Sequence, residues 1–97
     1  MSWDKEMVEE VWKKGKFTVK GKNWRKDACG DLILREDYGN RQSDYGWEID
    51  HIKPGGPDTL SNLQPLQWKN NVDKSDGRLK CNKISLVGRL LAAKKWR

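Results

Sequence analysis

Residues 45–56 read Tyr-Gly-Trp-Glu-Ile-Asp-His-Ile-Lys-Pro-Gly-Gly, and they carry the strongest strand signal in this 97-residue chain. Large apolar residues alternate with glycine or an acid up to the single histidine, His51, which predicts a strand over 45–52. The Pro-Gly-Gly run must then form a loop. Neighbouring residues on a strand point to opposite faces, so Asp50 and His51 could meet one ligand only near the strand's end, where the chain turns.

A second extended segment is predicted over 60–66, with Pro65 at its end because proline is poorly tolerated inside a sheet. A short helix is predicted next, over 67–75. The order strand, loop, strand, helix predicts an α+β fold built on a two-stranded antiparallel hairpin and one helix.

Flanking helices are predicted on both sides of this core. Large apolar residues recur at helical spacing over 3–14, and a basic helix is predicted over 79–95. Short strands are predicted around Phe17 and Val19 and over 32–34. The length favours a single domain, 1–97, with the functional core in 45–76.

The net charge of +6 is unevenly distributed. Basic blocks over 13–26 and 74–97 flank an acidic centre, so a polyanion would be attracted to the flanks and a cation to the middle. Solvation alone is the alternative explanation for the lysine runs. Basic residues close to the core in sequence could contact phosphates, and these are Arg35, Arg41, Lys53, Lys69, Lys74 and Arg78.

The two cysteines, Cys29 and Cys81, form no C-x-x-C pair, which excludes a four-cysteine zinc ribbon. A disulfide framework is not expected, and both are predicted to be small apolar residues in a reducing compartment. No apolar run approaches the roughly 20 residues that a membrane span needs. The N-terminus lacks the features of a signal peptide, so a cytoplasmic protein without a membrane partner is expected.

The core holds a set of groups suited to phosphodiester hydrolysis. An imidazole, here His51, titrates near neutral pH and can take a proton from water. Asp50 and Asn71 offer oxygen ligands, which suit Mg²⁺ or Mn²⁺ better than zinc. Asn62 is predicted to bond backbone groups of the loop after His51. Asn70 in place of Asn71 as ligand, and Asn62 as a plain turn residue, remain open.

Residues 45–76 resemble the HNH endonuclease motif, the ββα-metal class in its His-Asn-Asn form, over about a third of the chain. Asp-His, the glycine pair, Asn-Leu and Asn-x-x-Lys occur in the same order. The resemblance implies a ββα-metal core with His51 as general base and Asn62 as the loop-fixing residue. It also implies that Asp50 and Asn71 hold one divalent ion, and that DNA is cut to 5′-phosphate and 3′-hydroxyl ends.

The chain departs from that family at two points. Gln67 and Asn70 stand where many members carry a zinc-binding cysteine pair, so no structural zinc is expected and Trp47 and Trp68 are predicted to replace it by packing. The loop after Pro54 is also short for the family.

The expected function is a metal-dependent DNA endonuclease of low sequence specificity that acts as a monomer and nicks one strand at a time. The alternative is a nucleic-acid-binding module on the same scaffold, without turnover or active only beside a partner. An RNase or a secreted toxin with the same chemistry also remains open.

Overall fold

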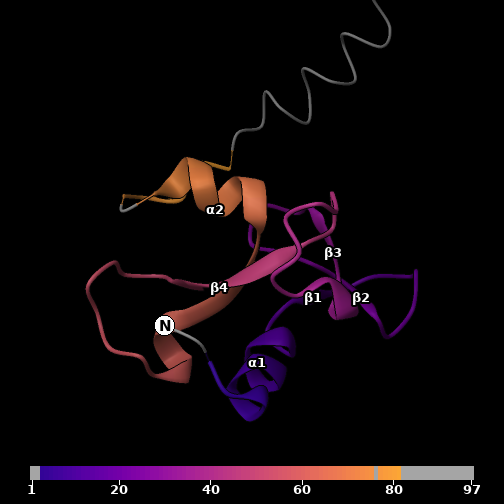
Figure 1. Ribbon diagram of the computed structural model, residues 1–97, viewed down its shortest axis with the longest axis horizontal. Helices are drawn as coiled ribbons and strands as arrows, with labels where there is room; N and C mark the ends of the chain where they lie inside the picture. Colours follow the sequence, from indigo (N-terminus) through magenta and orange to yellow (C-terminus); the bar gives the residue numbers. More distant parts are fainter. Residues whose placement is uncertain (1–2, 76, 82–97) are drawn as a thin grey trace, which may run out of the picture.

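The computed structural model describes residues 3–75 and 77–81. They form an α+β domain with two helices, a three-stranded sheet and a two-stranded sheet, both antiparallel (Figure 1). Two 3-10 turns are present, Arg35–Asp37 and Leu60–Asn62. In chain order the elements are α1 Lys5–Trp12, β1 Lys16–Phe17, β2 Trp24–Lys26, β3 Leu32–Leu34, β4 Trp47–His51, β5 Leu63–Gln67 and α2 Trp68–Lys74.

Helix α1 begins where Asp4 caps it. The Asp4 carboxylate accepts a hydrogen bond from the Met7 backbone N–H at 2.7 Å, satisfying one of the free donors of the first turn. The helix is shorter than the predicted 3–14 and ends at Trp12. None of the helices in the described part of the chain is long and apolar enough to cross a membrane.

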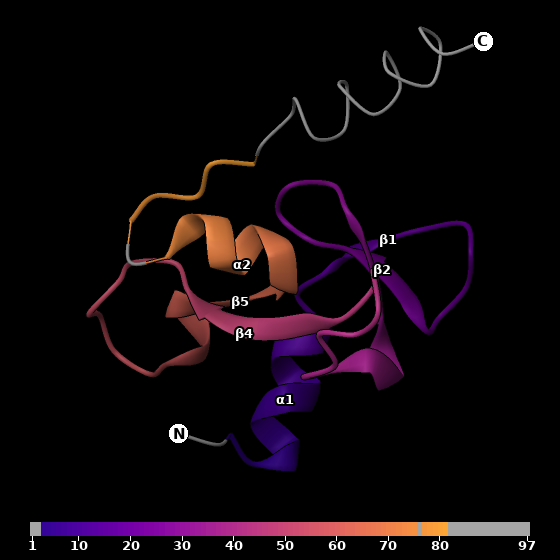
Figure 2. The same cartoon turned by 45° about the horizontal axis from the view of Figure 1, so that its top comes forward.

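One cluster of buried side chains joins α1 to both sheets. It contains Val11 and Trp12 from α1, Ile33 from β3, Trp47 from β4 and Leu63 from β5. The ring centroids of the two tryptophans lie 5.2 Å apart, and aromatic pairs of this size bury much apolar surface. The core lies on the α1 side of the β4–β5 pair, while α2 covers the other side (Figure 2).

The three-stranded sheet contains a strand, β2, that the sequence pattern did not predict. It pairs antiparallel with β1 and β3, and Arg25 lies opposite Phe17 on one side and Ile33 on the other. Three residues are too few to show an alternation of apolar and polar side chains. The short strand predicted around Phe17 and Val19 is confirmed at Phe17, which lies in β1, and is wrong at Val19, which lies in the exposed β1–β2 loop.

Strands β4 and β5 pair over their full lengths, with His51 opposite Leu63. The predicted order of strand, loop, strand and helix is therefore confirmed. Pro65 lies in the middle of β5 opposite Ile49, not at its end as predicted. Among the described residues this sheet has two strands, so the missing proline N–H can face an open edge.

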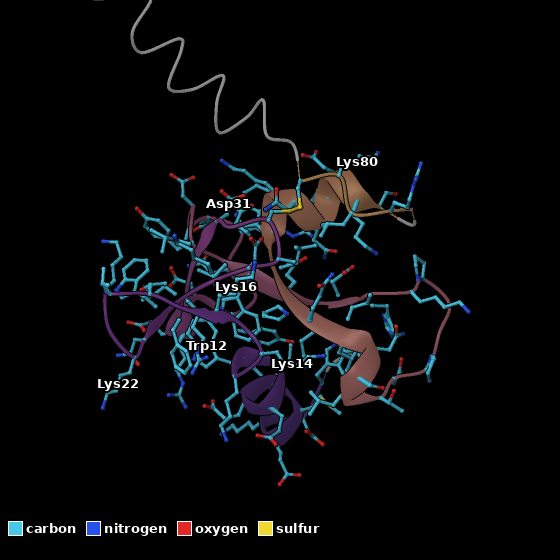
Figure 3. All side chains as sticks on the ribbon, turned by 180° about the vertical axis from the view of Figure 1, so that it is seen from behind. Trp12, Lys14, Lys16, Lys22, Asp31 and Lys80 are labelled. Atoms are coloured by element: carbon cyan, nitrogen blue, oxygen red, sulfur yellow. A yellow bond between two sulfur atoms is a disulfide. The ribbon has the colours of Figure 1, made fainter. Side chains whose placement is uncertain are left out.

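Cys29 and Cys81 form a disulfide, which corrects the expectation of two free apolar cysteines. Their Cα atoms lie 4.9 Å apart, although the residues are separated by 52 positions. The bond joins the turn after β2 to the segment after α2, near Asp31 and Lys80 in Figure 3. Of the predicted helix over 79–95, residues 79–81 are irregular, and 82–95 lie outside the described residues.

The buried carboxylate of Asp27 ties the start of α2 to the turn after β2. Its Oδ2 accepts hydrogen bonds from the Gln67 N–H and the Asn70 side-chain amide, both at 2.9 Å. Its Oδ1 accepts from the backbone N–H groups of Cys29 and Asp31, also at 2.9 Å. A carboxylate with this many donors can remain buried without a large desolvation cost.

Trp47 and Trp68 both take part in holding the fold together, as predicted. Trp47 packs in the core, and the Trp68 indole N–H donates to the Ser43 carbonyl at 2.7 Å. At Gln67 and Asn70 themselves, the contacts are hydrogen bonds to the Asp27 carboxylate.

Candidate functional site

Strand β4 presents its side chains alternately to α2 and α1. The carboxylates of Glu48 and Asp50 bond side chains of α2. His51, the last residue of the strand, instead packs on Trp3, with ring centroids 5.8 Å apart. Asp50 and His51 therefore lie on opposite faces of β4, at the end of the strand where the chain turns into the loop.

Asp50 is buried, with 6% of its surface exposed, and its charge is compensated. Its Oδ1 lies 3.2 Å from the ammonium of Lys74, and its Oδ2 accepts a hydrogen bond from the Gln64 amide at 2.9 Å. The ammonium also donates to the His51 carbonyl at 2.9 Å. Lys74 is only 2% exposed, so the structure places it beneath β4 and not at the surface position predicted for contact with phosphates.

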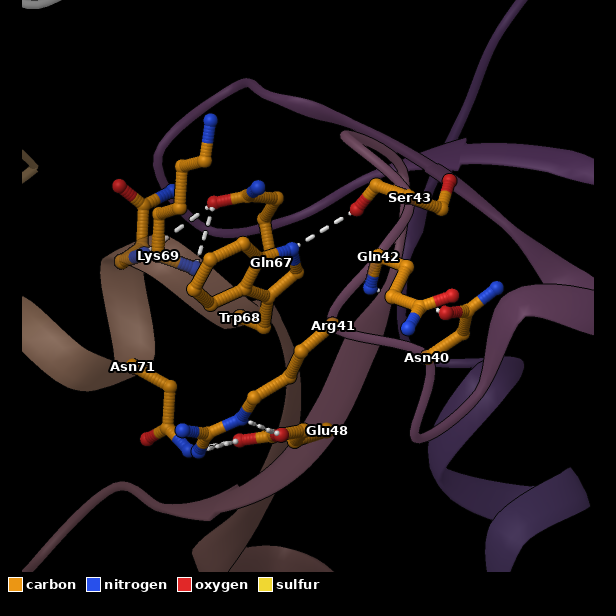
Figure 4. A network of polar contacts seen from close by, with 10 residues as sticks. Asn40, Arg41, Gln42, Ser43, Glu48, Gln67, Trp68, Lys69 and Asn71 are labelled. Carbon is orange, nitrogen blue, oxygen red and sulfur yellow. Dashed lines mark hydrogen bonds and ion pairs between the residues drawn. The ribbon is translucent and has the colours of Figure 1, made fainter.

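Asn71 reaches the same face of β4 from α2, as Figure 4 shows. Its carboxamide nitrogen donates to Glu48 Oε1 at 2.8 Å. Among residues 3–75 and 77–81, no group donates a hydrogen bond to its carboxamide oxygen, Oδ1. Arg41 binds both oxygens of Glu48, at 2.6 and 2.9 Å. These Arg41 hydrogen bonds are the main reason that the pKa of Glu48 is lowered, with burial opposing them.

Asn70, the alternative ligand, points away from this face. It is buried, and its side-chain amide donates to Asp27 and Asp31. The structure therefore places Asn71, and not its neighbour, beside Glu48 of β4.

The donor set fits a hard divalent cation in the type of its atoms. Asp50 and Asn71 offer a carboxylate and a carboxamide oxygen on one face, and Mg²⁺ and Mn²⁺ prefer oxygen ligands. In the described ranges, no three His, Cys, Asp or Glu side chains are grouped so as to hold a metal. Lys74 already neutralises Asp50, so a cation would share that carboxylate and bind weakly.

His51 is held by an acid from the following loop. Its Nε2 lies 2.5 Å from Asp58 Oδ1, and the imidazole is about one third exposed. A carboxylate can only accept, so in the neutral imidazole Nε2 carries the proton and Nδ1 keeps its lone pair. Asp58 had no sequence signal, because an acid in a loop has no fixed spacing from the side chain that it meets.

Asn62 bonds the loop between β4 and β5 on both sides. Its Oδ1 accepts from the Lys53 N–H at 2.9 Å, and its Nδ2 donates to the Pro57 carbonyl at 3.0 Å and the Lys53 carbonyl at 3.3 Å. A Cβ on Gly56 would lie 2.8 Å from the same Nδ2, so only glycine leaves room for this amide. These are the hydrogen bonds that a loop-fixing asparagine makes.

Most of the basic residues predicted to contact nucleic acid are engaged with acids. Arg35 pairs with Glu9, Arg41 with Glu48, Lys69 with Asp44 and Lys74 with Asp50. Lys53 and Arg78 are exposed and have no ion pair within the described part of the chain. Sequence alone could not show this pairing, because each acid comes from a different element or loop.

Gln64 was also missed. It lies directly opposite Asp50 in the β4–β5 register, so its amide reaches the carboxylate across the strands. The loop length that sets this register is not readable from residue types alone.

Comparisons with family models, with curated proteins and with solved structures found no match to this chain.

Proposed function

We propose that this protein is a divalent-metal-dependent DNA endonuclease of the HNH type. It would hydrolyse phosphodiester bonds to 5′-phosphate and 3′-hydroxyl ends. The observation that supports this most strongly is that α2 contacts β4 through Asn71 on Glu48 and Lys74 on Asp50, so Asp50 and Asn71 lie on the same side of the strand that ends at His51.

His51 is the proposed general base. With Nε2–H donated to Asp58, Nδ1 is the atom that takes the proton from the attacking water. Asn62 holds the backbone of the following loop, and thus the position of Asp58 relative to the imidazole. The base needs no large rearrangement, because its orienting partner is already in contact.

Asp50 and Asn71 are the proposed ligands of one Mg²⁺ or Mn²⁺. The bound ion would neutralise charge on the phosphoryl oxygens and on the leaving 3′-oxygen. Glu48 stays paired with Arg41 and contributes negative charge near the site without being counted as a ligand.

A single general base serves one phosphodiester at a time. A monomer should therefore nick duplex DNA, and a double-strand break would need two molecules or two events. A low sequence specificity is part of the proposal, because the sequence contains no recognisable module for reading DNA bases.

One observation favours the alternative, a nucleic-acid-binding module without turnover. The ammonium of Lys74 lies on Asp50 Oδ1 and supplies the positive charge that a metal would supply. Asp50 can act as a metal ligand only if the Lys74 ammonium moves away or if the two cations share the Asp50 carboxylate.

Nicking of supercoiled plasmid separates these two functions. Wild-type protein with Mg²⁺ or Mn²⁺ should convert supercoiled to open-circular DNA, and EDTA should stop the conversion. His51→Ala should be about 100- to 10,000-fold slower, the range typical for loss of a general base. Circular dichroism of the variant checks the fold. Equal nicking by both proteins, or nicking that EDTA leaves unchanged, would rule the mechanism out.

A further inference from the structure

In the basic block over 13–26, some side chains form ion pairs or hydrogen bonds to carbonyls, and others form neither. Lys13 pairs with Glu10, and Lys14 donates to the carbonyls of Leu60 and Leu63. Arg25 donates to the carbonyls of Lys13 and Gly15. The four remaining lysines have no ion pair with any described residue, and they are Lys16, Lys20, Lys22 and Lys26.

All four lysines without an ion pair lie on one hairpin, where the ammonium of Lys20 lies over the ring of Trp24, 5.2 Å from its centroid. Lys16 is in β1, Lys26 is in β2, and Lys20 and Lys22 are in the loop between these strands. Each is exposed, and no acid occurs between positions 13 and 26. Labels on Lys16 and Lys22 in Figure 3 mark two points on this hairpin. We name the four lysines, with the loop over 18–23, the basic hairpin.

The basic hairpin carries an internal repulsion. Lys16 lies directly opposite Lys26 in the β1–β2 register, and like charges in that position destabilise a strand pair. A polyanion placed over the hairpin would remove this repulsion. The pairing is thus unfavourable in the protein alone and favourable in a complex with phosphate groups.

The apolar side chains of the hairpin do not fit insertion into a membrane. Phe17 is 84% exposed, but the Arg25 guanidinium lies over its ring at 4.5 Å. The loop adds only Val19 as a large apolar residue, among Thr, Lys, Gly and Asn. A membrane-binding element would present a continuous apolar face, and this hairpin presents charge.

We infer that the basic hairpin is a docking surface for the phosphate backbone of duplex DNA. This inference deepens the proposed nuclease function and rests on it for the identity of the polyanion. In Figures 1 and 2 the β1–β2 loop and the loop after β4 lie at opposite ends of the molecule. The hairpin would therefore hold DNA away from the scissile phosphate, which strengthens binding without changing the chemical step.

The test compares two pairs of lysines in the full chain. Lys20→Gln with Lys22→Gln removes two charges from the basic hairpin, and Lys5→Gln with Lys13→Gln removes two exposed charges from the α1 region. Both are made in the His51→Ala background and titrated, in EDTA, with a labelled duplex at several salt concentrations. Thermal unfolding of each protein checks that the fold is retained.

The hairpin pair should weaken duplex binding about tenfold near 0.1 M salt, and the slope of log affinity against log salt should fall by roughly two. The α1 pair should change both quantities much less. Equal weakening by the two pairs, or wild-type binding by the hairpin pair, would overturn the inference. Binding of anionic phospholipid vesicles through the hairpin, with no binding of duplex, would overturn it as well.

The same variants with His51 restored separate this inference from the proposed function. If the plasmid is nicked, the hairpin pair should raise KM and leave kcat unchanged, and a lowered kcat at unchanged KM would contradict a docking role. If wild-type protein binds duplex through the hairpin but never nicks, the nuclease proposal fails and the docking surface stands.

Discussion

At the scale of single residues, a few side chains determine the protonation of the His51 imidazole and the charge balance of the Asp50 carboxylate. Asp58 determines which nitrogen of His51 carries the proton, and Lys74 compensates the charge of Asp50. Asn62 holds the backbone of the loop between His51 and Asp58, through Lys53 and Pro57. Each of these contacts joins residues from different parts of the β4–β5–α2 unit, so one substitution can alter the chemistry without altering the fold.

Asp58 is a positioning residue, and its removal should slow nicking while the protein stays folded. Asp58→Ala should lower the single-turnover rate about 10- to 100-fold, as loss of a carboxylate behind a functional histidine commonly does. Asp58→Asn keeps an acceptor for the Nε2–H and should recover part of the rate. Asp73→Ala removes an exposed acid of α2 and serves as the control for charge alone. Equal rates for Asp58→Ala and Asp73→Ala would show that Asp58 has no such role.

At the scale of elements, the hairpins β1–β2 and β4–β5 differ in whether their charged side chains are paired. The second buries its charges: Asp50 and Lys74 are paired beneath it, and Glu48 is tied to Arg41. The first exposes its lysines and sets two of them directly opposite each other. Charges that are paired within the fold are already neutralised, whereas unpaired charges of one sign attract a partner of opposite charge.

Lys16→Glu should affect stability and DNA binding in opposite directions. An opposite-charge pair with Lys26 replaces a like-charge pair, so the free energy of unfolding should rise by about 0.5 kcal/mol at low salt. Duplex binding should weaken, because a phosphate contact is replaced by a repulsive charge. Urea unfolding at low and high salt measures the first effect, which should shrink as salt screens it. A variant that is less stable at low salt, or that binds DNA as wild type does, would contradict this account.

At the scale of the whole molecule, the disulfide connects the segment after α2 to the three-stranded sheet. The expectation of a cytoplasmic protein rested in part on free thiols, and the bond between Cys29 and Cys81 removes that support. Localisation therefore stays a prediction. The bond closes a long loop that contains both β4 and α2.

Loss of the disulfide should lower the stability of the entire domain. Closing a loop between residues 52 positions apart restricts the unfolded chain, which in the chain-entropy model amounts to about 4 kcal/mol. Urea unfolding of wild type with and without dithiothreitol, beside Cys29→Ala with Cys81→Ala, measures this difference. The reductant should not affect the double variant. Unfolding free energies that are equal for all three would show that the bond contributes nothing.

Local sequence patterns were enough to predict α1, β4, β5 and α2 within a few residues of their bounds, and a short apolar run predicted β3. The alternation over 45–52 also placed Asp50 and His51 on opposite faces, because side-chain direction in a strand depends only on neighbours in sequence. The short basic β2 was missed, since three residues carry no period.

The sequence by itself determined the residue types, the order of elements within residues 45–76, and the faces of β4 on which the acids and the histidine lie. Only the tertiary structure decided which charges are paired: Asp58 with His51, Lys74 with Asp50, and the acids that engage Arg35 and Lys69. It also decided that the two cysteines meet and that the β1–β2 lysines stay unpaired within the described residues. The reason is physical, because packing of the apolar core brings distant segments together, and no local pattern records which side chains become neighbours.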